Sequence, residues 1–236
     1  MQTCDSQSGL CTINSKGVKE DNININHTAL FYVGDPMCSW CWGMSDELKK
    51  IQNFCTKEGI KFNVVLGGLR IGGGDPWNDQ FKGFLRNEWQ NIHKKTGQKF
   101  VYSLLDLEHF NYDTQPACLA VYIAKKILKG KDDNSLSVLE FFSKIQEKFY
   151  AKGLDSTKLE FYHDICKEFN IDINEFEKYF NSKEIKTELE NDFALASKLG
   201  ARGMPSLIYV KENKVIDISS GYKTYDDVLK MLKVRV

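Results

Sequence analysis

The sequence predicts an α/β fold in which both ends of the chain contribute strands to one sheet and a helical block is inserted between them. Runs typical of strands occur within residues 29–66 and again within 206–218. Residues 76–200 show helical spacing of apolar side chains and no convincing strand. A chain of 236 residues is long enough to bury a hydrophobic core, either as one large domain or as a small domain with a sizeable insertion.

The first predicted unit is a strand, a helix and a second strand. The apolar run 29–33 ends at a Gly-Asp-Pro turn, and apolar residues then recur at three- and four-residue spacing over 44–55, with Gly59 as a helix stop. Residues 60–66 predict the second strand. Such a unit, over about forty residues, favours two parallel strands joined by a right-handed crossover.

The middle of the chain predicts a series of helices. Asn174, followed by Glu177, has the spacing of a capping box, and a last long helix of the block ends at Gly200. Strand patterns return at 206–210 and 215–218, separated by a turn of hairpin length, and a final helix follows.

These patterns predict a division of the chain into three parts. We expect a polar N-terminal tail at residues 1–28, an α/β domain assembled from 29–75 and 201–236, and an inserted helical domain at 76–200.

Charge and hydropathy exclude several classes of partner. The chain has 32 Lys and Arg against 32 Asp and Glu, and no dense basic run, which argues against nucleic acid as a partner. No apolar stretch approaches the ~18 residues of a membrane-spanning helix, and residues 1–28 contain no signal-peptide core. We therefore expect a cytoplasmic protein that is not associated with a membrane.

The motif Cys38-Ser39-Trp40-Cys41 carries the predicted chemistry, because it follows the first strand at the start of a helix. Unpaired N–H groups and the helix dipole stabilise a thiolate there, so we expect the pKa of Cys38 to lie below its ordinary value of about 8.5. Cys41 lies one turn further on, where it can attack a mixed disulfide and release the substrate. Cys38 is therefore the predicted nucleophile and Cys41 the predicted resolving thiol.

Half of a zinc site is the alternative interpretation of this motif. Zinc needs two more ligands, yet the chain has no second Cys-x-x-Cys and its four histidines are far apart in the sequence. The position at a helix start favours the redox interpretation, with no bound metal.

A second motif, Gly203-Met204-Pro205-Ser206, stands directly before the penultimate strand. On spacing alone, Pro205 is equally well a loop residue. Together with the cysteine motif, however, it resembles the cis-proline site of redox proteins.

The chain resembles DsbA-like, thioredoxin-fold oxidoreductases, and within them the FrnE-like branch of predicted dithiol-disulfide isomerases. The matching segments follow one another in the right order and span residues 29–233; they are 35–43, 67–70, 113–118, 149–155 and 203–205. The resemblance implies a thioredoxin fold with an inserted all-helical domain that forms a lid over the site.

The resemblance also implies roles for individual residues. Cys38 attacks, Cys41 resolves, Pro205 is cis, and Met204 offers its backbone to an extended substrate. Apart from the resemblance, Trp40 is a candidate to line a hydrophobic substrate groove. The chain departs from thioredoxin and DsbA at Tyr32, where those proteins have a buried acid that helps to move the proton of the resolving thiol. No acid role is carried over to that position.

The function expected from this resemblance is thiol-disulfide exchange on protein or small-molecule substrates, in the reducing or isomerising direction. It needs no cofactor beyond the redox-active disulfide, although glutathione is a possible co-substrate; neither the redox partner nor the oligomeric state follows from the sequence. One alternative is a glutathione-dependent isomerase or transferase of the 2-hydroxychromene-2-carboxylate isomerase or kappa class. Another is a peptide-binding module without enzymatic activity.

Five further cysteines bring the total to seven, an odd and irregularly spaced set that favours reduced thiols over a disulfide framework. Cys55, Cys118 and Cys166 lie on apolar helix faces and are expected to be inert core thiols. Cys4 and Cys11 lie in the polar tail. For them we favour two idle thiols in a disordered tail, with an auxiliary disulfide that relays oxidation as the alternative.

Overall fold

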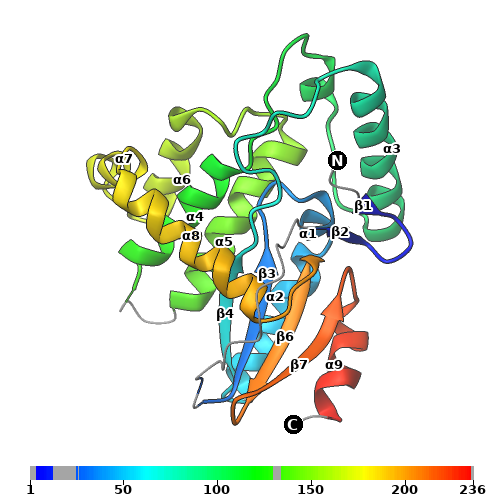
Figure 1. Ribbon diagram of the computed structural model, residues 1–236, viewed down its shortest axis with the longest axis vertical. Helices are drawn as coiled ribbons and strands as arrows, with labels where there is room; N and C mark the ends of the chain where they lie inside the picture. Colours follow the sequence, from blue (N-terminus) through cyan, green and yellow to red (C-terminus); the bar gives the residue numbers. More distant parts are fainter. Residues whose placement is uncertain (1–3, 13–24, 26, 130–133, 235–236) are drawn as a thin grey trace.

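The computed structural model describes residues 4–12, 25, 27–129 and 134–234, with side chains described from 138 onward in the last range. A four-stranded sheet lies at its centre in the order β4-β3-β6-β7. Its strands are β3 (Ala29–Gly34), β4 (Lys61–Leu66), β6 (Ser206–Lys211) and β7 (Lys214–Ser220). As Figure 1 shows, both ends of the chain supply this sheet.

The strand directions follow from the connections. β3 and β4 are parallel, with Ala29 opposite Lys61 and Gly34 opposite Leu66, because a helix returns the chain between them. β6 pairs antiparallel with both β3 and β7. Between β6 and β7 the turn residues Glu212 and Asn213 have φ angles of 50° and 60°, the left-handed region of tight hairpin turns.

Helices pack on this sheet and form most of the remaining regular structure in the described part of the chain. Helices α2 and α9 pack against each other, while α5 and α8 pack on the β4 edge. The helices are α1 (Ser39–Gly43), α2 (Ser45–Lys57), α3 (Asp79–Thr96), α4 (Gln115–Ile127), α5 (Asn134–Gln146), α6 (His163–Glu168), α7 (Ile173–Phe180), α8 (Lys183–Lys198) and α9 (Tyr225–Lys233). Shorter helical turns are η1 (Ser103–Asp106), η2 (Glu147–Ala151) and η3 (Leu159–Tyr162).

The predicted order of elements is confirmed, with differences at helix ends. The predicted first helix is divided at Met44 into α1 and α2. The capping box expected from Asn174 and Glu177 is wrong, because the Asp172 side chain accepts the hydrogen bond from the Glu175 N–H and begins α7 two residues earlier.

A second, smaller sheet joins the N-terminal segment to the main fold. It contains β1 (Cys4–Asp5), β2 (Leu10–Thr12) and β5 (Gly203–Met204), in that order. We call residues 4–12 the N-terminal hairpin. Figure 1 shows it beside α1 and α3, near the end of the sheet where β3 leads into α1.

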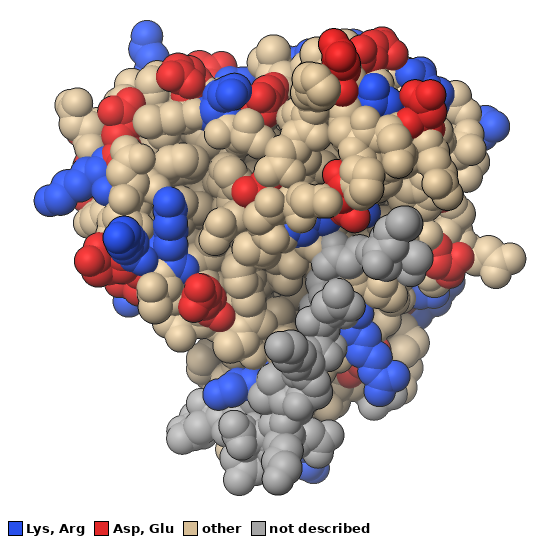
Figure 2. Space-filling view, turned by 45° about the horizontal axis from the view of Figure 1, so that its top comes forward, with Lys and Arg blue, Asp and Glu red and all other residues tan. Residues whose placement is uncertain are grey.

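Charged residues are spread over the surface seen in Figure 2, where acidic and basic side chains alternate without a large field of one sign. Among the described helices, none is both long and apolar enough to cross a bilayer.

Candidate active site

The two cysteines of the motif lie at the start of α1, directly after β3. Cys38 is the N-cap residue with extended backbone (φ −85°, ψ 118°), and its N–H donates to the Asp35 carbonyl at 3.0 Å. Cys41 lies within α1. Both are free thiols with no exposed surface. We call Cys38 and Cys41 the redox pair.

The segment around Pro205 faces this pair. The Met204–Pro205 peptide bond is cis, and the Sγ atom of Cys38 lies 3.7 Å from the Met204 carbonyl oxygen. The Met204 side chain packs over Gly67, where an added Cβ would lie 2.3 Å from the methionine sulfur. Residues far apart in the sequence therefore meet at the thiol.

Two tyrosines hold the turn that precedes Cys38. The hydroxyl of Tyr112 donates to the Met37 carbonyl at 2.9 Å, and that of Tyr150 donates to the same oxygen at 2.6 Å. The two hydroxyls are 3.2 Å apart. Because Met37 is the residue directly before Cys38, this pair of donors fixes the backbone that carries the thiol.

Asp35 is a buried acid, although its place in a Gly-Asp-Pro turn predicts only a turn residue. One carboxylate oxygen accepts from the Met37 N–H at 2.8 Å. The other accepts from the Leu69 N–H and the Thr114 hydroxyl, each at 2.7 Å, and from the Cys118 thiol at 3.3 Å. The signal was present, since segments 35–43, 67–70 and 113–118 were all among the matching motifs.

Burial controls the ionisation of the thiol. It raises the pKa of Cys38 well above the ordinary range of a cysteine, and the neighbouring Cys41 and the Asp35 carboxylate add to that effect. The expectation of a lowered pKa is therefore wrong for this conformation. The covering segments exclude water from the thiolate, and α1 is only five residues long before it breaks at Met44, so desolvation outweighs the helix dipole.

Tyr32 occupies the position where thioredoxin has a buried acid. Its side chain has no exposed surface, and its hydroxyl borders the redox pair. Burial, followed by the nearby Cys41, raises the pKa of Tyr32 well above its ordinary value, so this phenol holds its proton at neutral pH. The buried acid of this site is Asp35, whose pKa burial also raises.

The two tryptophans of segment 35–43 face different neighbours. Trp40, expected to line the substrate site, is fully buried; its indole N–H donates to Glu88 at 3.4 Å and its ring lies 5.9 Å from that of Tyr222. Trp42 donates to the Lys99 carbonyl at 3.0 Å and stacks on Tyr150.

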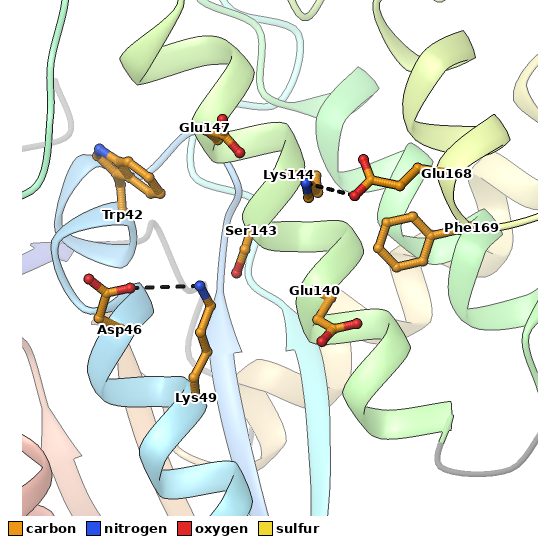
Figure 3. Close-up of a pocket in the computed structure, with 9 residues that line it drawn as sticks. All are labelled: Trp42, Asp46, Lys49, Glu140, Ser143, Lys144, Glu147, Glu168 and Phe169. Atoms are coloured by element: carbon orange, nitrogen blue, oxygen red, sulfur yellow. Dashed lines mark ion pairs between the residues drawn. The ribbon is translucent and has the colours of Figure 1, made fainter.

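A groove of about 450 Å³ opens beside Trp42, between α2 and α5 (Figure 3). Its other lining residues are mostly charged, and they include the ion pairs Asp46–Lys49 and Lys144–Glu168. Neither cysteine of the redox pair lines this groove.

The N-terminal hairpin corrects the expectation of a disordered tail with idle thiols. Cys4 and Cys11 form a disulfide, and β2 pairs antiparallel with β5 so that Cys11 lies opposite Met204. Strands of two and three residues are too short to give a pattern in the sequence. The pairing is possible because Gly203 has no side chain, since a Cβ there would lie 2.5 Å from the Cys11 carbonyl oxygen.

The remaining cysteines are all buried free thiols. Burial raises the pKa of Cys55 and that of Cys166 to about 12 each. Cys118 differs from these two because its thiol donates to Asp35, so it belongs to the hydrogen-bonded network under the site. Among the described residues, no group of three or more His, Cys, Asp or Glu is arranged to hold a metal ion.

Comparison with known families gives one match over most of the chain. A family model described as Thioredoxin matches residues 31–227. Among curated relatives, the ClpXP adapter protein SpxH of Bacillus cereus is 23% identical over 208 residues. That alignment covers 84% of this chain and 65% of the relative, so the chain spans less than two thirds of that protein's length.

Solved structures match this chain over a larger share of their own length than the curated relative does. A candidate protein disulfide isomerase from Nitrosomonas europaea superimposes with a TM-score of 0.76 at 26% identity, covering 89% of this chain and 97% of the other. The cytosolic disulfide reductase DsbM from Pseudomonas aeruginosa gives 0.67 at 21% identity, covering 88% and 98%. A DsbA oxidoreductase candidate from Streptomyces coelicolor gives 0.63 at 13% identity, covering 89% and 90%. The predicted thioredoxin-like, DsbA-like fold is thus confirmed.

Proposed function

The chain belongs to the thioredoxin family, and from that premise we propose that it is a thiol-disulfide oxidoreductase in which Cys38 attacks and Cys41 resolves. The observation that carries the proposal is the position of Cys38. Its Sγ atom lies 3.7 Å from the carbonyl of Met204 in the short strand β5. The backbone of β5 pairs with β2 here, which is the kind of pairing that an extended peptide would make.

The reaction proceeds by two exchanges. The Cys38 thiolate attacks a substrate disulfide, a mixed disulfide forms, and the other substrate sulfur leaves as a thiolate. Cys41 then attacks the Cys38 sulfur, the redox pair becomes a disulfide, and the second substrate sulfur leaves. Two electrons pass to the substrate. Protein disulfides and small disulfides such as oxidised glutathione are the proposed substrate class, in the reducing or isomerising direction.

Tyr32 assists the second exchange in this proposal. Because its pKa is raised, the phenol is protonated at neutral pH and acts as a hydrogen-bond donor rather than a base. From this position the hydroxyl can donate to the Cys41 sulfur as that sulfur attacks Cys38. Asp35 acts one step further away, since it holds the Met37 and Leu69 backbone on either side of the site.

The proposal is tested with three variants in an insulin-reduction assay supplied with glutathione. Cys38→Ser is expected to abolish turnover, and Cys41→Ala is expected to accumulate mixed disulfides through Cys38. Cys55→Ala removes a buried thiol outside the site and serves as the matched control, with turnover retained. Unchanged turnover in Cys38→Ser would exclude the proposed mechanism.

A second candidate function is that of a protein-binding adapter. The observation in its favour is the set of relatives named ClpXP adapter protein SpxH, which match at 21–23% identity. A Cys38→Ser/Cys41→Ser variant separates the two functions. Retained capture of a protein partner, together with no redox turnover in the parent chain, would favour the adapter.

The glutathione-dependent isomerase alternative has less support. A 2-hydroxychromene-2-carboxylate isomerase shares the fold, with a TM-score of 0.55 at 10% identity, which speaks to architecture alone. This chain has both cysteines of an exchange pair, whereas a glutathione-dependent isomerisation requires no net exchange of disulfides.

A further inference from the structure

The N-terminal hairpin occupies the strand position beside Met204. β2 pairs antiparallel with β5, Cys11 lies opposite Met204, and Thr12 lies opposite Gly203. The Met204 carbonyl is the same group that lies 3.7 Å from Cys38 Sγ. Met204 of β5 therefore lies both beside the attacking thiol and opposite Cys11 of β2.

Contacts along the hairpin hold this register. Gly9 fits against the redox motif, because a Cβ there would lie 2.6 Å from Tyr222 Cβ and 3.0 Å from the Trp40 ring. The Gly9 carbonyl accepts from the Tyr222 N–H at 3.1 Å. At the tip of the hairpin, the Ser6 hydroxyl donates to Glu88, the residue that also accepts from Trp40. The hairpin is thus seated by side chains of α1 and α3 as well as by backbone pairing.

The two sulfurs of the hairpin disulfide differ in their surroundings. Cys11 is fully buried against β5, whereas Cys4 is half-buried on the outer strand of the small sheet. A disulfide that served only to staple the turn would stabilise it equally well at the protein surface. Here Cys11 lies on the strand paired with β5, which is the position where the proposed function places an extended substrate.

We propose that the Cys4–Cys11 disulfide is an internal substrate of the redox pair, so that the chain passes two electrons between its own two cysteine pairs. This inference rests on the proposed function, because it uses Cys38 and Cys41 in the same roles. The buried redox pair then has a substrate within the same chain, so the first exchange needs no access from solvent.

The exchange balances without an outside oxidant. The Cys38 thiolate attacks the sulfur of Cys11, the bond between Cys38 and Cys11 forms, and Cys4 leaves as a thiolate. Cys41 then attacks Cys38, the redox pair becomes a disulfide, and Cys11 leaves. The two protons of the redox-pair thiols end on the hairpin thiols, and the reverse sequence restores the starting state.

The attack is directed at Cys11 for two reasons. Its backbone is fixed opposite Met204, whereas Cys4 lies one strand further from β5. The leaving sulfur, Cys4, is the more exposed of the two, so water stabilises it as a thiolate. Of the released dithiol, Cys4 is the thiol nearer the molecular surface, where an outside disulfide can begin to reoxidise the pair.

Two double variants test which sulfur meets Cys38. Cys4→Ser/Cys41→Ser leaves Cys11 as the hairpin thiol available to Cys38, and Cys11→Ser/Cys41→Ser leaves Cys4 instead. After equilibration in one glutathione redox buffer, trypsin separates residues 1–16 from 20–49, so a disulfide between these peptides is read by mass spectrometry. We expect on the order of tenfold more of this cross-link in the first variant, within monomers and independent of protein concentration.

A single variant tests the exchange itself. Cys41→Ser, prepared with the hairpin disulfide formed, is brought to alkaline pH and quenched with an alkylating reagent over time. We expect free Cys4 to appear in step with the disappearance of free Cys38, and chymotryptic cleavage after Leu10 separates Cys4 from Cys11. Equal cross-linking in the two double variants, or a Cys41→Ser sample without the joined peptide, overturns the inference.

The same samples separate this inference from the proposed function. Glutathionylation of Cys38 in the absence of any link to Cys11 would refute the internal exchange and leave the oxidoreductase proposal standing. A Cys38 that exchanges with neither glutathione nor the hairpin would refute both. Circular dichroism of each variant controls for loss of the fold.

Discussion

The Cys118 thiol donates a hydrogen bond to the Asp35 carboxylate at 3.3 Å, across a separation of 83 residues. The same carboxylate oxygen accepts from Thr114 and from the Leu69 N–H. A buried carboxylate with this many donors ties the turn before the redox pair to the start of α4. Its loss affects both segments at once.

Asp35→Asn is therefore expected to destabilise the fold. An amide nitrogen replaces one acceptor oxygen, so at least one buried donor loses its partner, at a cost of about 1–3 kcal/mol. Urea unfolding followed by circular dichroism measures the change. Glu190→Gln on the exposed surface of α8 is the matched control, with an expected change within about 0.5 kcal/mol. Equal unfolding midpoints in the two variants would show that the network contributes nothing.

The pH dependence of Cys38 alkylation follows from its raised pKa. Below that pKa the thiolate fraction falls tenfold per pH unit, so the alkylation rate of Cys41→Ser should rise about tenfold per unit across pH 7–9 without a plateau. A thiol activated by a helix start would instead level off below about pH 8.5. Mass spectrometry of residues 20–49 gives the rate.

The raised pKa of Cys38 also determines how the free energy of unfolding changes with pH. The native chain keeps a proton on Cys38 that the unfolded chain loses at its ordinary pKa of about 8.5. Burial of the neutral thiol therefore contributes fully below that pH, and its contribution is lost as the pH rises above it.

The course of the chain was predictable from local patterns. The apolar run of β3 and the three- and four-residue spacing of α2 reflect faces that each element buries by itself, so they are visible without the tertiary structure. The redox interpretation of the Cys38 motif depends on the strand before it and the helix after it, and both of these are visible in the local sequence.

The network under the site was not predictable in the same way. Asp35 gains its donors from β4–α3 and α4 segments that only the folded chain brings together. The ionisation of Cys38 depends on its burial, and the segments around the site include a hairpin whose strands are two and three residues long and whose Cys11 lies opposite Met204. Periodicity cannot detect strands of that length.

Tyr112 and Tyr150, whose hydroxyls both donate to the Met37 carbonyl, are expected to be coupled energetically. Either hydroxyl alone still donates to the Met37 carbonyl, so Tyr112→Phe and Tyr150→Phe should each cost about 1 kcal/mol of unfolding free energy. The double variant leaves that buried carbonyl without either donor and should exceed the sum of the singles by roughly 0.5–3 kcal/mol. Urea unfolding of all three variants measures this.

A third tyrosine supplies the control for that cycle. The Tyr122 hydroxyl donates to Glu188 at 3.2 Å and shares no partner with Tyr150. Tyr122→Phe combined with Tyr150→Phe should therefore be additive within about 0.5 kcal/mol. Additivity in the Tyr112–Tyr150 cycle as well would mean that the Met37 carbonyl does not depend on them jointly.

Release of the N-terminal hairpin should expose Cys38, and two glycines allow a matched test. Gly9 and Gly59 have φ angles of +67° and +66°, so alanine strains the backbone equally at both, by roughly 1–2 kcal/mol. Only at Gly9 does the added Cβ meet neighbours, Tyr222 at 2.6 Å and Trp40 at 3.0 Å, whereas Gly59 has no atom within 4 Å.

Gly9→Ala is therefore expected to unseat the hairpin, while Gly59→Ala leaves it in place. We expect alkylation of Cys38 to accelerate about tenfold in the first variant only, because water reaches the thiol and its pKa falls toward the ordinary value. The cross-link between Cys11 and Cys38, measured in the Cys4→Ser/Cys41→Ser background, should fall in parallel. If Gly9→Ala changes neither the alkylation rate nor the cross-link relative to Gly59→Ala, then the hairpin does not control access to the redox pair.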